Sequence, residues 1–305
     1  MRGYFHLKLS GATIPYQSVF RDDLFAGQTV IVTGGGSGIG RCTAHELAAL
    51  GAHVALVGRT AEKLEAVRAE ILQDGGSAST HVCDIRDELA VGATIDAVLQ
   101  LRGRLDGLVN NAGGQYRTAM KTISTKGFEA VVRNNLTGGF IFMREAYLRW
   151  MEANGGAIVN IIADIWNGWP DFAHSGAARG GMLTLTETAA CEWAAAGVRV
   201  NTVAPGGIAS SGFDTYSPEA KAKILEFPQR VPLQRYGTES EVSAAIVYLL
   251  SPAAAYITGS CIRVDGGTPN ARTTWNLEPH HRSKPFEAFH RASLPKLLTE
   301  GIPTP

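Results

Sequence analysis

The chain has few of the features that mark secreted, membrane or nucleic-acid-binding proteins. Its 28 Lys and Arg residues balance its 28 Asp and Glu residues, with no basic stripe or acidic tail, so we expect no nucleic-acid or membrane partner. No apolar run reaches the roughly 18 residues of a membrane helix, and Lys8, Gly11 and Pro15 interrupt the N-terminal stretch, unlike a signal peptide. These absences predict a soluble, cytoplasmic protein with a small-molecule substrate.

Cysteine is also scarce. Cys42, Cys83, Cys191 and Cys261 form no C-x-x-C pair and have no metal-like spacing with histidine, so we expect reduced thiols and no metal site. The C-terminus lacks the peroxisomal address of small, basic and leucine residues, which again favours the cytoplasm.

What the chain does have is a regular alternation of short β-branched runs with segments of helical length. This pattern is typical of a parallel sheet covered by helices on both faces. We expect an α/β fold, a single Rossmann-type doubly wound domain of about seven parallel strands, with ligands bound beyond the strands' carboxyl ends. The expected strands are 29–34, 53–58, 79–84, 105–110, 157–162, 198–203 and 261–265, and the expected helices 39–50, 61–74, 87–102, 127–153, 175–196 and 239–251.

The two ends of the chain differ from this body. We expect an N-terminal arm over residues 1–25, the dinucleotide-binding and catalytic domain over 26–268, and a proline-rich C-terminal tail over 269–305. The tail is expected to be partly extended and to lie on the body or on a neighbouring subunit. Its His280-His281 pair has no carboxylate or cysteine pattern around it, so no metal is assigned there.

The stretch "VIVTGGGSGIG" places Gly34, Gly38 and Gly40 between the first strand and the first helix. Glycines let the backbone approach a pyrophosphate, whose charge the helix N-terminus stabilises. The second strand ends in Gly58-Arg59, where an acidic side chain would select NAD. Because a guanidinium suits a 2′-phosphate, the sequence predicts NADP(H) as the cofactor.

Two neighbouring residues leave alternatives open. Arg41, in the first turn of the first helix, either reinforces the phosphate site or is an ordinary surface residue. Asp84, at the end of the third strand, either recognises adenine or caps a helix.

Spaced motifs then point to a known family. With Thr33-Gly-Gly-Gly-Ser-Gly-Ile-Gly40, Asn110-Asn-Ala-Gly113, Asn135 in "RNNLTGG" and Pro205-Gly206, the chain resembles the short-chain dehydrogenase/reductase family over roughly residues 26 to 268. The resemblance implies a homotetramer, an Asn-Asn-Ala-Gly segment that steadies the sheet near the cofactor, and a Pro-Gly loop beside the nicotinamide. With the residues above, the candidate cofactor-binding set is Thr33, Gly34, Gly36, Ser37, Gly38, Ile39, Gly40, Arg59, Asp84, Asn111, Ala112, Gly113, Arg179, Pro205, Gly206 and Ile208.

The family's reaction centre of serine, tyrosine, lysine and asparagine is largely replaced. Asn135 matches the asparagine, but Ile162 and Ala163 stand at the serine position, Ser175 at the tyrosine and Arg179 at the lysine. An ordinary ketoreductase needs a phenol whose pKa is lowered by the lysine. Ordinary carbonyl reduction is therefore disfavoured.

One branch of the family lacks this tyrosine. The wording around "HSGAARGGM" resembles the peroxisomal trans-2-enoyl-CoA reductases, and the related 2,4-dienoyl-CoA reductases carry serine at the position of Ser175. In that branch charge develops on a thioester oxygen, which needs an oxyanion-type site and a proton for the α-carbon. The resemblance implies an NADPH-dependent enoyl-CoA reductase. The alternatives are a dehydrogenase of a branched terpenoid alcohol or aldehyde, such as citronellol, and a catalytically impaired NADP(H)-binding protein.

This chain also departs from that branch. Leu183 and Glu187 stand where the peroxisomal reductases carry a tyrosine and a lysine further along the helix, and Asp164 stands where the dienoyl reductases carry a tyrosine. Asp164 is either the acid of the pocket, with its pKa raised by burial, or a capping or water-bound carboxylate.

The candidate catalytic residues carry open alternatives too. Arg179 either bonds the nicotinamide ribose or forms a structural ion pair, and Ser175 either bonds the thioester oxygen or only packs. Tyr116 and Trp166 are expected on the substrate side, beside the loop 208–229, which carries no legible code for acyl length. The candidate catalytic set is Asn135, Ser175, Arg179 and Asp164.

Overall fold

The protein is described by a computed structural model that covers residues 16–210, 218–271 and 274–300. Seven strands form one parallel sheet in the order β3-β2-β1-β4-β5-β6-β7. The predicted fold class, a doubly wound α/β domain, is confirmed. The strands are β1 (Thr29–Thr33), β2 (His53–Gly58), β3 (Ser77–Val82), β4 (Gly107–Asn110), β5 (Gly156–Ile161), β6 (Val198–Pro205) and β7 (Cys261–Val264).

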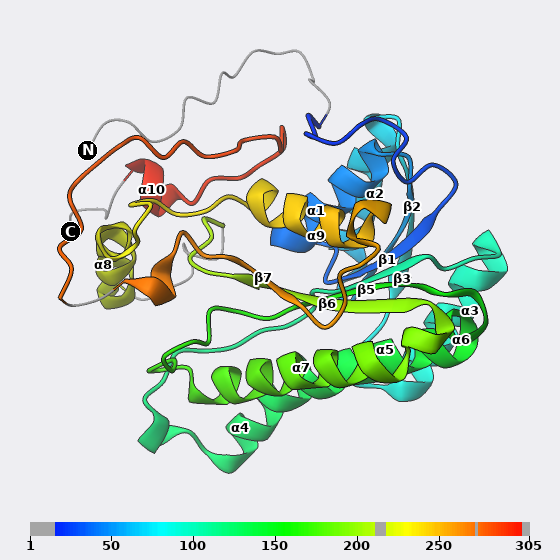
Figure 1. Cartoon of the computed structure of the whole chain (residues 1–305), viewed down its shortest axis with the longest axis horizontal. Helices are drawn as coiled ribbons and strands as arrows, with labels where there is room; N and C mark the ends of the chain where they lie inside the picture. Colours follow the sequence, from blue (N-terminus) through cyan, green and yellow to red (C-terminus); the bar gives the residue numbers. More distant parts are fainter. Residues whose placement is uncertain (1–15, 211–217, 272–273, 301–305) are drawn as a thin grey trace.

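Helices cover both faces of the sheet because its strands are apolar on both sides. Val30 and Val32 belong to the core under α1, α2 and α9, whereas Ile31 between them belongs to the core over α3, α5 and α7. Figure 1 shows these two helical layers on opposite sides of the strands. The α-helices are α1 (Gly38–Ala49), α2 (Ala61–Gln73), α3 (Glu88–Arg102), α4 (Thr125–Val132), α5 (Gly138–Ala146), α6 (Glu152–Asn154), α7 (Ala173–Glu192), α8 (Pro218–Glu226), α9 (Glu239–Leu250) and α10 (Lys296–Glu300).

Two helical regions differ from expectation. The single helix expected over 127–153 is one helical run that contains π-helical turns at Arg133–Thr137 and Tyr147–Met151. The substrate loop contains α8, which begins at Pro218 and was not expected. Expectations for residues 1–15, 211–217, 272–273 and 301–305 fall outside the described residues.

The strand order reverses direction between β1 and β4. At such a switch point the loops after neighbouring strands diverge and leave a crevice beyond the carboxyl ends of the strands. The loops after β1, β4, β5 and β6 carry most of the candidate residues, so the fold brings these distant motifs to one edge of the sheet.

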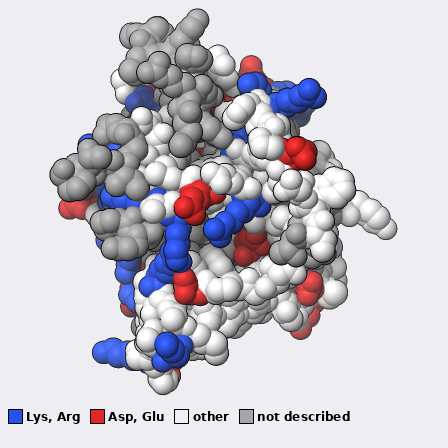
Figure 2. Space-filling view, turned by 90° about the vertical axis from the view of Figure 1, so that its left-hand side faces the viewer, with Lys and Arg blue, Asp and Glu red and all other residues white. Residues whose placement is uncertain are grey.

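The surface offers no broad area of one charge on the face that Figure 2 presents, where basic and acidic side chains are interspersed. Among the described helices, none combines the length and the apolar character needed to cross a membrane. In the same part of the chain, no three His, Cys, Asp or Glu side chains are grouped as metal ligands.

Candidate functional site

The glycine-rich turn after β1 requires glycine at several positions. Gly34 and Gly38 adopt positive φ angles of 67° and 57°, and a Cβ on Gly40 would lie 2.3 Å from the Gly34 carbonyl oxygen. Ser37 is the N-cap residue of α1, yet its side chain makes no capping hydrogen bond. The turn therefore presents a free hydroxyl and free helix N–H groups, which suit an anion.

The Asn-Asn-Ala-Gly segment after β4 is fastened to this turn. The Asn111 side-chain amide donates to the Thr33 carbonyl oxygen at 3.0 Å. The backbone N–H groups of Asn111 and Ala112 both donate to the Thr33 hydroxyl at 3.0 Å. Thr33 and Asn111 thus hold the glycine turn in shape.

A cavity of about 170 Å³ opens beside the glycine turn, between the ends of β2 and β3. Arg59 and Lys63 place two cations on its wall. Gly58, the last residue of β2, has no side chain at the position where an acidic residue would select NAD. Lys63 was missed by sequence reasoning, although it follows Arg59 by four residues and lies in the first turn of α2.

Asp84 lines this cavity but is already paired. Its carboxylate accepts two hydrogen bonds from the Arg86 guanidinium, at 2.9 and 2.6 Å, and these bonds lower its pKa to about 2. The N-cap of α3 is Asp87 rather than Asp84, which removes the capping alternative for Asp84.

Arg41 does not reach the cavity beside Arg59. Its guanidinium donates two hydrogen bonds of 2.8 Å to Glu70 and one of 3.1 Å to the Arg291 carbonyl oxygen. Of the two alternatives for Arg41, the contact with a phosphate site is not found, because Glu70 and the Arg291 carbonyl oxygen engage its donors.

A second and larger cavity, of about 880 Å³, lies beyond the ends of β4, β5 and β6. A third of about 220 Å³ shares Gly113 with both of the others, so the three cavities follow one another along the edge of the sheet. Pro205, Gly206 and Ile208 line the large cavity, as does Ile39. Apart from Thr33 and Gly40, the candidate cofactor residues thus line one crevice.

Asp164 belongs to the wall of the large cavity. Its Oδ1 atom is buried and has no hydrogen-bond partner. Burial raises the pKa of the carboxyl group, and the nearby carboxylate of Asp265 raises it further. Asp164 therefore holds a proton more readily than an exposed aspartate, which is the property that a general acid needs.

Arg179 reaches the same cavity from α7. It is 8% exposed, donates one 2.5 Å hydrogen bond to the Ile161 carbonyl oxygen, and leaves its buried Nε without a partner. Burial lowers its pKa to about 10, so the side chain stays charged at neutral pH. No ion pair among the described residues includes it, so the structural ion pair considered from the sequence is not found there.

Ser175 lies just outside this wall. It is fully buried, and its hydroxyl donates to Gln115 Oε1 at 2.9 Å. Gln115, which does line the cavity, was missed by sequence reasoning although it directly follows Asn-Asn-Ala-Gly-Gly. Ser175 therefore contacts the lining residue Gln115 rather than the cavity itself.

Asn135 occupies a similar supporting position. Its amide nitrogen donates to the carbonyl oxygens of Gly114 and Val131, at 2.7 and 3.0 Å, and its Oδ1 accepts from the Gly114 N–H at 3.0 Å. The π-helical turn at Arg133–Thr137 turns this side chain toward the loop. Asn135 thus shapes the segment that carries Gln115 and is not among the described residues lining the cavity.

The two aromatic candidates, Trp166 and Tyr116, lie in different places. Trp166 lines the large cavity, with the Arg263 guanidinium 5.4 Å from its ring centre. Tyr116 is 44% exposed and packs its ring edge-to-face against His174, with ring centres 4.6 Å apart. It is not among the described lining residues, so its expected place on the cavity wall is not found.

A dinucleotide fits the residues of this crevice. The glycine turn has positions that a Cβ would fill, the Ser37 hydroxyl is uncapped, and Arg179 carries an unpartnered buried donor. The glycine turn and the Ser37 hydroxyl would meet phosphate oxygens, and the Arg179 donor would meet an oxygen atom in the large cavity.

Comparison with known proteins bears on this arrangement. Residues 34–269 match the model of a family described as Enoyl-(Acyl carrier protein) reductase. A probable 2,4-dienoyl-CoA reductase of Bacillus subtilis (strain 168) is 37% identical over 243 residues, which are 79% of this chain and 96% of that protein. A peroxisomal 2,4-dienoyl-CoA reductase of Danio rerio is 34% identical over 256 residues, 83% of this chain and 85% of that protein.

A solved structure is more similar in sequence. A citronellol catabolism dehydrogenase (AtuB) of Pseudomonas aeruginosa PAO1 is 57% identical, with a TM-score of 0.76. The match covers 83% of this chain and 100% of that chain. The body of the chain is thus shared with these relatives, whereas part of its length lies outside the match.

Proposed function

Because the chain belongs to the short-chain dehydrogenase/reductase family of oxidoreductases, we propose that it uses NADPH to reduce the carbon–carbon double bond of an enoyl thioester. One observation carries this proposal. Among the described residues that line the large cavity, Asp164 and Arg179 are the ionisable ones, and no tyrosine is present. An acid and an unpaired cation match a reaction in which negative charge develops on one atom and another takes a proton.

The reaction divides between these two side chains. When bound, the reduced nicotinamide supplies a hydride to the β-carbon of the substrate. The Arg179 guanidinium stabilises the electron pair that moves from the double bond onto the thioester oxygen. Asp164 in its protonated form then gives its proton to the α-carbon, the thioester carbonyl re-forms, and the carboxylate is reprotonated from water through the open cavity.

The reaction is tested directly with purified protein, NADPH and trans-2-enoyl-CoA substrates of graded length. We expect loss of NADPH absorbance, with one NADPH consumed for each double bond reduced. Binding of NADPH without turnover of any thioester or enone in the panel would contradict the proposal and favour the catalytically impaired alternative.

A second candidate rests on the 57% identity to the citronellol catabolism dehydrogenase. It is the oxidation of a branched terpenoid alcohol, in which the Asp164 carboxylate would accept the hydroxyl proton. The same protein preparation decides between the two reactions. Turnover of such alcohols with NADP⁺, without any turnover of the thioesters with NADPH, would favour alcohol oxidation over enoyl-thioester reduction.

We propose that Arg59 and Lys63 give the preference for NADPH, because both line the cavity beside the glycine turn. Gly58 lines the same cavity, at the position where an acidic side chain would select NAD. Each charge-assisted hydrogen bond contributes about 1.5–3 kcal/mol. We therefore expect that the double substitution Arg59→Ala/Lys63→Ala, which removes two such bonds, weakens NADPH binding by about 10²- to 10⁴-fold and changes NADH binding by less than about threefold.

Cofactor fluorescence titration measures both constants. Arg68→Ala is the matched control, since Arg68 is a half-exposed cation on the same helix, paired with Glu65 and absent from the cavity wall. Equal losses of NADPH and NADH affinity would show that these cations do not recognise the 2′-phosphate.

Gln115 is proposed to donate a hydrogen bond to the substrate. Because its Oε1 accepts from Ser175, its amide N–H groups are directed to other partners. We expect Gln115→Leu to lower kcat by about tenfold and Ser175→Ala by about threefold, since the serine only orients the amide. Gln115→Glu is the matched control, because it keeps the shape and loses the donor. If Ser175→Ala lowered kcat more than Gln115→Leu does, the serine would act on the substrate itself.

A further inference from the structure

The C-terminal tail lies against the body of the same chain, at the edge where α1, α2 and α9 meet. The family match ends at residue 269, so this segment is an addition to the shared body. We call residues 278–291 the C-terminal strap. Figure 1 shows the tail running from the region of α8 to α1 and back toward α8.

The first part of the strap is hydrogen-bonded to Gln234 and Arg235, which precede α9. The His280 N–H donates to Gln234 Oε1 at 2.8 Å, and the Gln234 amide donates to the Glu278 carbonyl oxygen at 2.9 Å. Arg235 Nε donates to the Ser283 hydroxyl at 2.9 Å. Backbone and side-chain groups thus serve as donors and acceptors on both segments, and these hydrogen bonds hold the strap and residues 234–235 together.

The middle of the strap is attached to the first turn of α9. The Thr238 hydroxyl donates to the Phe286 carbonyl oxygen at 2.8 Å, and the Phe286 N–H donates to the Glu241 carboxylate at 3.3 Å. The Phe289 N–H donates to the Ser240 hydroxyl at 3.0 Å, and Phe289 is 3% exposed. This contact adds a small apolar core to the hydrogen bonds.

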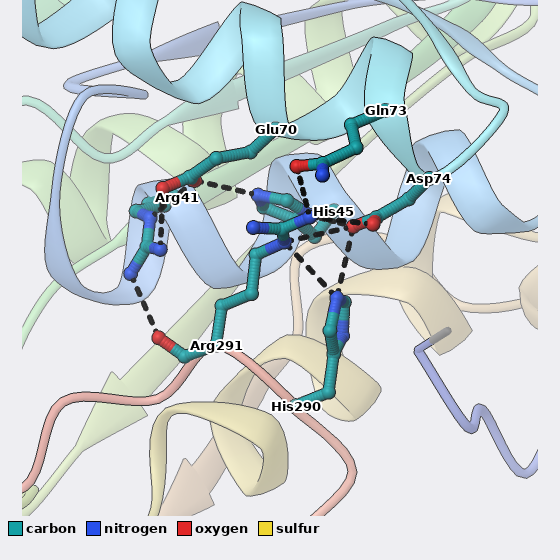
Figure 3. A network of polar contacts seen from close by, with 7 residues as sticks. All are labelled: Arg41, His45, Glu70, Gln73, Asp74, His290 and Arg291. Carbon is teal, nitrogen blue, oxygen red and sulfur yellow. Dashed lines mark hydrogen bonds and ion pairs between the residues drawn. The ribbon is translucent and has the colours of Figure 1, made fainter. Parts of the chain in front are cut away.

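The end of the strap is fixed to α2, as Figure 3 shows. Arg291 donates to both carboxylate oxygens of Asp74, at 2.6 and 3.0 Å, and to Gln73 at 3.0 Å. His290 lies 2.9 Å from the same carboxylate. Asp74 is therefore the main anchor, because a forked arginine–carboxylate pair is among the stronger polar contacts in proteins.

The segment held by the strap also forms part of the large cavity's support. The Gly237 N–H donates to the Gly207 carbonyl oxygen, and the Ala209 N–H donates to the Gly237 carbonyl oxygen, both at 2.9 Å. Gly207 and Ile208 line the large cavity, and Ile208 pairs with Gly237 as an isolated parallel bridge. A Cβ on Gly237 would lie 2.7 Å from Ile208 Cδ1, so the two stretches are in close contact.

We propose that the C-terminal strap positions the substrate-side wall of the cavity. It clamps residues 234–241 against α1 and α2, and through Gly237 it sets the place of Gly207–Ala209. The strap residues are positioning residues, since none of them lines the large cavity. Small displacements of such a wall lower turnover and affinity strongly. The inference does not depend on which substrate the cavity takes.

The test uses the full-length protein with Asp74→Asn, which keeps the size of the anchor and removes its charge. By hydrogen exchange we expect about tenfold faster exchange in 205–209 and 234–241, with β1 to β5 unchanged. In steady-state kinetics we expect KM for the substrate to rise about fivefold, because the displaced residues Gly207 and Ile208 line the large cavity. NADPH affinity should fall by a smaller factor, because Ile208 is one wall residue whereas Lys63, at the opposite end of α2 from Asp74, keeps its place.

Glu65→Gln is the matched control, as an exposed carboxylate on the same helix whose partners are Arg68 and Thr80. A second variant, Ser283→Ala, loosens the other end of the strap and is expected to accelerate exchange in the same two segments. Unchanged exchange there in both variants would overturn the proposal. Equal acceleration across all strands would also overturn it, since the strap would then contribute only global stability.

Discussion

Arg179→Met is expected to lower kcat by about 10²- to 10³-fold, the loss typical of removing one donor that stabilises a developing oxyanion. Arg179 is buried, reaches the large cavity and is held by the Ile161 carbonyl oxygen alone among the described protein groups. Methionine fills a similar length without charge or donors, so it removes the cation and keeps the packing. Stopped-flow measurement of NADPH oxidation with a saturating thioester separates this loss from weaker binding.

The same substitution is expected to leave the thermal midpoint of unfolding equal to or above that of the unsubstituted protein. A buried charge without a counter-charge pays a desolvation penalty of several kcal/mol, and methionine relieves it, although the Ile161 carbonyl loses its donor. Activity and stability then move in opposite directions, which is typical of a residue retained for function.

Arg179→Lys is the matched variant, because it keeps a cation on the same helix and loses the planar fork. We expect it to recover at least about tenfold of the lost kcat. If Arg179→Met retained kcat within about tenfold of the unsubstituted protein, the charge would not act on the reacting atoms. A lower unfolding midpoint in Arg179→Met would assign Arg179 a structural role.

The fold and the position of the glycine turn were predictable from local pattern. The strands are short apolar runs, and the glycine spacing after β1 requires a tight turn that leads into a helix N-terminus. The parallel order then places the loops after β1, β4, β5 and β6 at one edge without further information. This is why residues as distant as Gly34 and Pro205 could be assigned to one crevice.

The partners of individual side chains were less predictable, because they depend on long-range contacts. Arg41 is positioned by sequence for a phosphate, yet Glu70 and the carbonyl of Arg291, 29 and 250 residues away, engage its donors. Asn135 and Ser175 match the expected motif positions, but their hydrogen bonds go to Gly114 and Gln115. Sequence position gives the place of a side chain and does not give what it bonds.

Asp164→Asn is expected to have an effect as large as that of Arg179→Met. Proton transfer by a positioned side chain contributes about 10²- to 10⁴-fold, and asparagine has no acidic proton to give. Burial and the carboxylate of Asp265 raise the pKa of Asp164 above its ordinary value. The protonated fraction, and with it kcat, falls as pH rises through that raised pKa, so the unsubstituted protein should lose activity on the alkaline side.

Asp265→Asn is the matched control for the pH profile. It removes the like charge that faces Asp164 and can still accept from the Gly267 N–H, which now bonds Asp265 Oδ1 at 2.8 Å. Because the Asp164 pKa should then fall, the alkaline loss of kcat should begin at lower pH, with the plateau kcat within about threefold. Asp164→Asn should instead abolish the dependence along with most of the rate. A kcat–pH profile of Asp164→Asn that keeps the original shape would assign the proton to another group, with bound water reached through Gln115 as the next candidate.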